Sequence, residues 1–92
     1  MYQLSALAEK DITSILDYSA KNFGYEIMLE YFNSLKNCLN ILEKNIELGI
    51  NISHIRKGYR CFYHRSHVIY YKKYQSSILV VRILHKSMDV SR

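Results

Sequence analysis

The stretch that decides the fold lies near the end of the chain and reads Ser77-Ile-Leu-Val-Val-Arg-Ile-Leu-His-Lys-Ser-Met-Asp89. Between Ile78 and Leu84 every residue is apolar except Arg82. This run is too short, and too rich in Val and Ile, to favour a helix. We therefore predict a buried, central last strand that leads directly into a charged tail.

Alternation along this strand should divide its side chains between two faces. We expect one face to carry Leu79, Val81 and Ile83, and the other to carry Ile78, Val80, Arg82 and Leu84. One face should seal a core, and the other should present the arginine. Because a guanidinium is not buried without partners, Arg82 should either find a carboxylate or point into a wet groove.

Length and composition indicate one globular domain that spans residues 1–92. Apolar residues make up 49% of the chain, which is an ordinary share for such a domain. The sequence has neither a run of about eighteen apolar residues nor the pattern of a signal peptide. We therefore expect a cytoplasmic protein that does not cross a membrane. Cys38 and Cys61 fall in predicted helix and strand interiors, where we expect reduced, buried thiols.

Charge is distributed unevenly along the chain. Residues 1–55 hold four Lys and Arg against seven Asp and Glu, a net charge of −3, whereas residues 56–92 hold nine against one, a net charge of +8. The C-terminal half should therefore attract an acidic partner. Nucleic acid, an acidic protein and an acidic disordered segment all fit, since net charge steers association without identifying the partner.

The first half of the chain predicts a short strand and then a helix. The segment from Tyr2 to Ser5 alternates apolar and polar residues and is typical of an edge strand. Ser5 is then a suitable N-cap for a helix from about Ala6. Glu9 and Asp11 place negative charge in its early turns, where the helix dipole favours it. The core-facing stripe of this helix comprises Ala8, Ile12, Ile15, Leu16, Ser19 and Phe23.

A second, longer helix follows Gly24, which is a natural C′ residue for the first. Because Gly24 leaves almost no linker, the two helices should fold back on each other as an antiparallel hairpin. The second helix has the strongest periodicity in the chain, with an apolar stripe of Ile27, Met28, Tyr31, Phe32, Leu35, Cys38, Leu39, Leu42 and Ile46.

The last part of the chain predicts strands. The segment from Leu48 to Gly58 loses periodicity and is interpreted as a surface connection with at most one helical turn. Three β-rich runs then follow with short turns between them, namely Tyr59 to Tyr63, Val68 to Tyr74 and Ile78 to Leu84. The predicted fold is α+β with two layers in the order β-α-α-β-β-β. The helical hairpin should cover one face of the sheet and leave the other face open.

Between Arg56 and Tyr74 six Lys and Arg residues are interleaved with six aromatic residues. This pattern suits a nucleic-acid surface, because cations neutralise phosphates and rings stack on bases. It suits equally well a sheet with a basic solvent face, because tyrosine is a favoured strand residue. The pattern alone leaves both interpretations open.

Two other residue patterns suggest chemistry. The spacing of Cys61, His64 and His67, three residues apart, invites a metal site. Along strands, however, Cys61 and His67 would share one face while His64 lies on the other. Because the tight turn offers no fourth ligand, we expect no metal. His85 could serve as an acid or base in a metal-free ribonuclease, with Arg82, Lys86 and Arg60 holding the phosphate charge. A histidine at a strand end is more often a packing or capping residue, so spacing alone leaves this chemistry unresolved.

Four segments form a pattern that covers nearly the whole chain: Leu4-Ser-Ala-Leu-Ala-Glu-Lys-Asp-Ile12, Ile55-Arg-Lys-Gly-Tyr-Arg-Cys-Phe62, Ser66-His-Val-Ile-Tyr-Tyr71 and Val81-Arg-Ile-Leu-His-Lys-Ser-Met-Asp89. Together they resemble the RelE/ParE toxin superfamily, and the ParE branch is the most similar. The resemblance implies the strand, helical hairpin and strand meander predicted above. It also implies a ParD-type or related antitoxin, encoded beside the toxin, that neutralises it.

The resemblance implies one of two activities. RelE-like members cut mRNA on the ribosome with basic residues and a tyrosine or histidine near the chain end, whereas ParE-like members poison DNA gyrase. Arg60 and Arg82 could match the basic positions of the nuclease branch, but Val90 stands where nucleases often place a tyrosine. His85 lies in the Leu-His-x-x-Met-Asp pattern of the ParE branch. The resemblance therefore favours a gyrase-directed toxin that is not an enzyme and needs no cofactor.

Two alternatives remain at this point, a ribosome-dependent mRNA endonuclease and an inactive member that only binds its antitoxin. ParE-like members usually continue for a few residues beyond the equivalents of Ser91 and Arg92, so a trimmed or attenuated form is a further alternative.

The resemblance and the charge pattern together nominate two sets of residues. We expect contacts to the target from Arg60, Arg82, His85, Lys86, Met88 and Asp89. We expect contacts to the antitoxin from Tyr2, Tyr31, Leu84, Arg65 and Lys72. The antitoxin should be acidic, with a C-terminal segment that is disordered alone and folds into the groove between the helical hairpin and the sheet. We expect no sequence-specific nucleic-acid binding.

Overall fold

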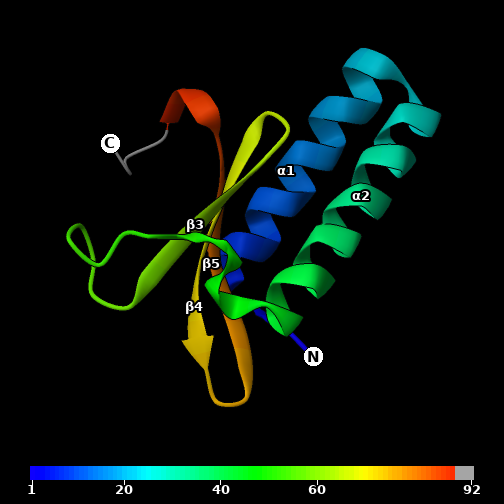
Figure 1. The fold of residues 1–92 in the computed structure, drawn as a ribbon. Helices are drawn as coiled ribbons and strands as arrows, with labels where there is room; N and C mark the ends of the chain where they lie inside the picture. The colour runs from blue at the N-terminus through cyan, green and yellow to red at the C-terminus, as the bar shows by residue number, and fades with distance from the viewer. Residues whose placement is uncertain (89–92) are drawn as a thin grey trace.

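A computed structural model describes residues 1–88 of the chain (Figure 1). Its elements, in chain order, are β1 (Gln3–Leu4), α1 (Ala6–Phe23), α2 (Tyr25–Lys44), the 3₁₀ helix η1 (Ile46–Leu48), β2 (Ile50–Asn51), β3 (Tyr59–His64), β4 (His67–Tyr74), β5 (Ser77–His85) and the 3₁₀ helix η2 (Lys86–Met88). In this part of the chain no helix is both long and apolar enough to span a membrane.

The strands form one five-stranded sheet in the order β1-β5-β4-β3-β2. β1 pairs with β5 in parallel, and all other neighbouring strands are antiparallel. α1 and α2 lie side by side on one face of the sheet, as Figure 1 shows. The predicted α+β class and the central position of the last strand are therefore confirmed.

Two residues set the ends of the helices as the sequence predicts. The Ser5 hydroxyl accepts a hydrogen bond from the Ala8 N–H at 3.0 Å, which caps α1, and donates to the Val81 carbonyl at 2.7 Å. Gly24 has φ +93°, a conformation that favours glycine, and its N–H donates to the Ala20 carbonyl at 3.1 Å. It ends α1 and immediately precedes α2, so the antiparallel helical hairpin is confirmed.

The main core lies between the helical hairpin and the sheet. α2 provides most of the helical side, and β4 and β5 provide the floor. Its buried members are Ala8, Tyr31, Leu35, Cys38, Leu39, Leu42, Ile69, Tyr71, Ile78, Val80 and Ile83. Cys38 is buried here, as predicted.

The predicted division of the β5 side chains is wrong because the strand contains a β-bulge. Tyr70 pairs with Arg82 whereas Tyr71 pairs with Val80, so Val81 is an extra residue on β5. One extra residue reverses the alternation beyond it. Val80 and Ile83 therefore both enter the main core, although simple alternation assigned them to opposite faces.

The sequence predicts an open outer face of the sheet, and this prediction is wrong. The outer face carries a second, smaller core. Ile52, Cys61, Val68 and Tyr70 are all buried there, with Tyr59 and Leu84 packed against them. The segment predicted as a surface connection, residues 48–58, supplies both Ile52 and the short strand β2. This segment has no usable periodicity because only two of its residues form a strand and only one enters a core.

Tyr71 fastens this connecting segment to the sheet. Its hydroxyl donates to the Ile46 carbonyl at 2.7 Å and accepts from the Gly49 N–H at 2.9 Å. A Cβ at position 49 would collide with that hydroxyl, so glycine is required for the close approach.

Replacing Tyr71 with Phe should lower the free energy of unfolding by about 1 to 3 kcal/mol, because a backbone N–H and a backbone carbonyl lose a buried partner. Tyr74→Phe is the matched control, since Tyr74 is exposed on the same strand, and it should change stability by less than about 0.5 kcal/mol. Urea denaturation measures both. Equal stabilities of the two variants would contradict the anchoring role of Tyr71.

Candidate functional site

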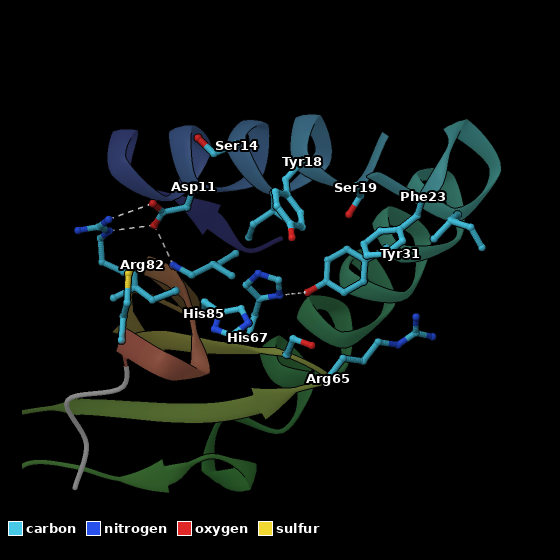
Figure 2. Close-up of a pocket in the computed structure, with 16 residues that line it drawn as sticks. Asp11, Ser14, Tyr18, Ser19, Phe23, Tyr31, Arg65, His67, Arg82 and His85 are labelled. Atoms are coloured by element: carbon cyan, nitrogen blue, oxygen red, sulfur yellow. Dashed lines mark hydrogen bonds and ion pairs between the residues drawn. The ribbon is translucent and has the colours of Figure 1, made fainter. Parts of the chain in front are cut away.

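An open cleft of about 640 Å³ lies between the helical hairpin and the C-terminal end of β5 (Figure 2). Its walls come from α1, the start of α2, the turn between β3 and β4, and the end of β5 with η2. β1 pairs only with Leu79 and Val80, so the edge of β5 beyond them is not covered by another strand. The cleft follows that edge, and residues that start from either face of the sheet therefore reach it.

One wall of the cleft is unusually apolar for a surface. Tyr18 is 63% exposed and Phe23 is 61% exposed, and their rings meet edge to face with centroids 6.3 Å apart. Ile27 and Met88 are also exposed and line the same space. A contiguous exposed apolar surface of this kind is typical of a protein-binding site.

The opposite end of the cleft contains a paired arginine. Arg82 Nε donates to Asp11 Oδ2 at 2.9 Å, and a terminal guanidinium nitrogen donates to Oδ1 at 3.0 Å. The Ile83 N–H also donates to Asp11 Oδ2, at 2.9 Å. The hydrogen bonds of its guanidinium with the Asp11 carboxylate raise the pKa of Arg82. Of the two alternatives that the sequence left for Arg82, the structure shows the carboxylate.

Asp11 binds Arg82 in the cleft, whereas the sequence analysis assigned it only to the start of the first helix. Its position in the second turn of α1 suggested only a favourable interaction with the helix dipole. Its side chain is 13% exposed, against 37% for Arg82. The two residues are 71 positions apart, and no local pattern could have paired them.

Three histidines form a row across the sheet beside the cleft. His64 pairs with His67 across the turn between β3 and β4, and His67 pairs with His85 across β4 and β5. Paired residues share a face, so all three lie on the helix side, whereas Cys61 lies in the outer core. The expectation that His64 would lie opposite His67 is therefore wrong, because the two-residue turn brings them directly side by side.

α2 covers two members of the histidine row. The Tyr31 hydroxyl lies 2.6 Å from His67 Nδ1, and the Ser34 hydroxyl lies 3.1 Å from His64 Nε2. Burial lowers the pKa of His64 and of His67, and neighbouring positive charge lowers both further. Burial raises the pKa of Tyr31 to about 12. At neutral pH the two histidines are therefore neutral and the phenol keeps its proton.

The residues nominated as target contacts do not all come together. Arg82, His85 and Met88 line the cleft, and Lys86 lies beside it on the exposed helix η2. Arg60 lies elsewhere, with its guanidinium donating to the Gly49 carbonyl at 2.9 Å. Asp89 falls outside the described residues.

The residues nominated as antitoxin contacts divide in the same way. Tyr31, Leu84 and Arg65 line the cleft, so it contains members of both nominated sets. Tyr2 lines a separate hollow near the N-terminus, and Lys72 lies on the outer face with its ammonium 5.7 Å from the Tyr59 ring. Within residues 1–88, no three His, Cys, Asp or Glu side chains are grouped to hold a metal ion.

Comparison with known proteins gives a consistent picture. The family model for the ParE toxin of type II toxin-antitoxin systems, parDE, matches residues 2–90. "Toxin ParE1" of Caulobacter vibrioides is 30% identical over 88 residues, which are 96% of this chain and 91% of that protein. "Toxin ParE1" of Mycobacterium tuberculosis is 32% identical over 92 residues, which are 99% of this chain and 94% of that protein.

A solved structure, the chromosomal ParDE TA system from P. aeruginosa, superposes with a TM-score of 0.77 at 17% identity. The match covers 91% of this chain and 92% of that one, and at this identity it supports the fold alone. The family assignment depends on the sequence matches, which span nearly the whole chain. The chain therefore belongs to the ParE toxin family of type II toxin-antitoxin systems.

Proposed function

We propose that this toxin acts in the cytoplasm by poisoning DNA gyrase, that it is not itself an enzyme, and that a ParD-type antitoxin neutralises it. The observation that carries the proposal is the family match over residues 2–90. The resemblance of this chain to ParE-like toxins is most specific in the segment from Arg82 to Asp89.

The arrangement of cations supports a gyrase-directed toxin over a nuclease. Arg60 pairs across the sheet with Tyr71 and Arg82 with the adjacent Tyr70, so the two arginines start from opposite faces. Arg82 is bound to Asp11 and Arg60 to a backbone carbonyl. These two cations are therefore poorly placed to hold one phosphate between them, as an RNA-cleaving site requires.

One observation favours the RNA endonuclease as a second candidate. His67 and His85 have ring centroids 5.6 Å apart and line the cleft together with Arg82. Two histidines beside a cation can act as acid and base in phosphodiester cleavage. The experiment that tests the first proposal should therefore also measure mRNA cleavage.

The cleft is the proposed antitoxin site. Tyr18, Phe23 and Ile27 supply an apolar wall, while Arg65 and Arg82 supply positive charge at its sides. An amphipathic acidic segment would bury apolar side chains against the first and place carboxylates near the second. Folding of that segment on binding uses part of the interaction energy but lets a short chain cover a large surface.

Purified toxin, freed of antitoxin, should inhibit gyrase supercoiling and promote gyrase-dependent cleavage of plasmid DNA. Supercoiling and cleavage assays on agarose gels measure both effects, with antitoxin added back as the control that reverses them. Supercoiling that is unaffected at a large molar excess of toxin, together with cleavage of ribosome-bound mRNA, would move the assignment to the RelE branch.

Charge removal beside the cleft should weaken toxicity in steps, because rim charges change association more than they abolish function. We expect Lys86→Gln to reduce toxicity roughly two- to fivefold, the range typical of one exposed charge interaction. Lys73→Gln is the matched control, since Lys73 is exposed at the far end of β4. Growth inhibition after graded induction measures the effect.

Arg82→Gln should reduce toxicity further, but it also removes the contact with Asp11, so thermal stability must be measured on the same variant. His85→Ala tests the enzyme alternative directly. Loss of an intrinsic ribonuclease activity in His85→Ala would show that the non-enzymatic proposal is wrong.

The association rate with antitoxin should fall as salt is raised, because steering by the basic C-terminal half is screened once the Debye length is about 10 Å, near 0.1 M salt. The dissociation rate should change much less, since it reports buried apolar contacts. Stopped-flow or surface-plasmon measurements give both rates. A salt-independent association rate would count against steering. An antitoxin segment that is already helical before mixing would count against coupled folding.

A further inference from the structure

The hydrogen bonds around the histidine row determine where each neutral histidine carries its proton. The Ser34 hydroxyl donates its only proton to the Tyr31 carbonyl at 2.8 Å, so it must accept from His64 Nε2 at 3.1 Å. His85 Nδ1 accepts from the Ser87 N–H at 3.1 Å. Neutral His64 and neutral His85 therefore both carry their proton on Nε2.

The same reasoning applies to His67. The phenol of Tyr31 keeps its proton at neutral pH and lies 2.6 Å from His67 Nδ1. No described residue offers that phenol proton a different acceptor, so Tyr31 donates to Nδ1. His67 therefore also carries its proton on Nε2.

Two of these Nε2–H groups remain available. His64 uses its Nε2–H on Ser34, but no described residue accepts from Nε2 of His67 or of His85. Within residues 1–88, no buried side-chain nitrogen or oxygen of a partly buried residue lacks a partner, so the unused Nε2 of His67 is accessible to solvent. His85 is an exposed residue. Both rings line the cleft and lie next to each other in Figure 2.

Two ion pairs flank the row in the free protein. Arg65 pairs with Glu30 of α2 at 3.5 Å, and Arg82 pairs with Asp11 of α1. α2 otherwise presents the neutral Tyr31 and Ser34 to the row, and β3 presents His64. Two N–H donors therefore lie between two paired arginines, and no anion among residues 1–88 is bonded to them.

We propose that His67 and His85 form a carboxylate-binding subsite of the cleft, which takes an Asp or Glu side chain of the antitoxin segment and takes up protons as it does so. The inference rests on the proposed antitoxin. A carboxylate only accepts hydrogen bonds and has two oxygens, which suits two neighbouring N–H donors.

Proton uptake follows from the change of environment at the row. In the free protein, burial lowers the pKa of His67, and the charge that the neighbouring histidines carry when they are protonated lowers it further. An adjacent carboxylate favours the charged imidazolium and so raises the pKa of His67, whose second proton, on Nδ1, the Tyr31 hydroxyl can turn to accept. Because the bound state then holds more protons than the free state, antitoxin binding should tighten as pH falls.

An acetate titration of the free toxin tests the subsite without antitoxin or gyrase. Imidazole NMR signals of His67 and His85 should shift saturably with acetate at constant ionic strength, and the pKa of His67 should rise. His54, exposed in the segment before β3, is the internal control and should not respond. No response of His67 and His85, or a response to inorganic phosphate but not to acetate, would overturn the carboxylate assignment.

The complex with antitoxin provides the second arm. The pKa of His67 should be higher in the complex than in the free toxin, and affinity should rise about tenfold for each unit by which this pKa rises, as pH falls from 8 to below 6. A His67 pKa that falls or stays the same in an intact complex would overturn the subsite while leaving the antitoxin proposal standing.

Substitutions separate the subsite from general effects of pH. His67→Gln keeps an N–H donor but cannot titrate, so it should flatten the pH dependence of binding. His85→Ala removes the second N–H donor and should weaken binding at every pH. His85 is exposed, so its replacement should fold normally even if that of His67 does not. His54→Gln is the matched control and should retain the full pH dependence. Unchanged affinity of folded His85→Ala for the antitoxin would contradict a role for His85.

Discussion

The carboxylate of Asp11 is the contact on which the arrangement of helix, sheet edge and cleft depends. It accepts three hydrogen bonds, two from the Arg82 guanidinium and one from the Ile83 N–H. β1 stops pairing at Val80, so without Asp11 this stretch of the β5 edge would lack a partner in the part of the chain described. Ser5 binds the preceding part of the β5 edge, because its N–H donates to the Val80 carbonyl and its hydroxyl donates to the Val81 carbonyl. α1 is therefore held along the edge of β5 by polar contacts as well as by core packing.

The bulge at Val81 makes this arrangement compatible with a sealed core. Val80 and Ile83 both reach the main core because one extra residue lies between the two paired segments of β5. Arg82, which follows the bulge, can then turn around the strand edge to Asp11 while its neighbour Ile83 points inward. The same strand thus contributes both an apolar floor beneath the helices and a charged rim beside the cleft.

Local sequence patterns predicted the local features of this fold. Ser5 caps α1, Gly24 separates the helices, and the Val- and Ile-rich stretch is a central strand, because each of these depends on residues close in sequence. The bulge depends on pairing with β4, and β2 depends on its pairing with β3, so neither has a signature of its own.

The candidate site was predictable only in part, for the same reason. The sequence nominated Arg82, His85, Tyr31 and Leu84, and all four line the cleft. These nominations were possible because the resemblance and the strand pattern depend only on the segments that contain these residues. It missed Asp11 because the partner of that residue is 71 positions away. It missed the shared side of His64 and His67 because the alternation was counted along the chain. The hairpin turn instead pairs the two residues side by side on one face of the sheet.

The cleft also suggests how neutralisation could work without a change of shape in the toxin. Arg82, His85 and Met88 were nominated for the target, and Tyr31, Leu84 and Arg65 for the antitoxin, yet all six line one continuous space. A segment that buried Tyr18 and Phe23 and reached the histidine row would cover the three residues nominated for the target together with the three nominated for the antitoxin. Target contact and antitoxin binding would then exclude each other by direct competition for the same surface, which requires only that the antitoxin bind more tightly than the target.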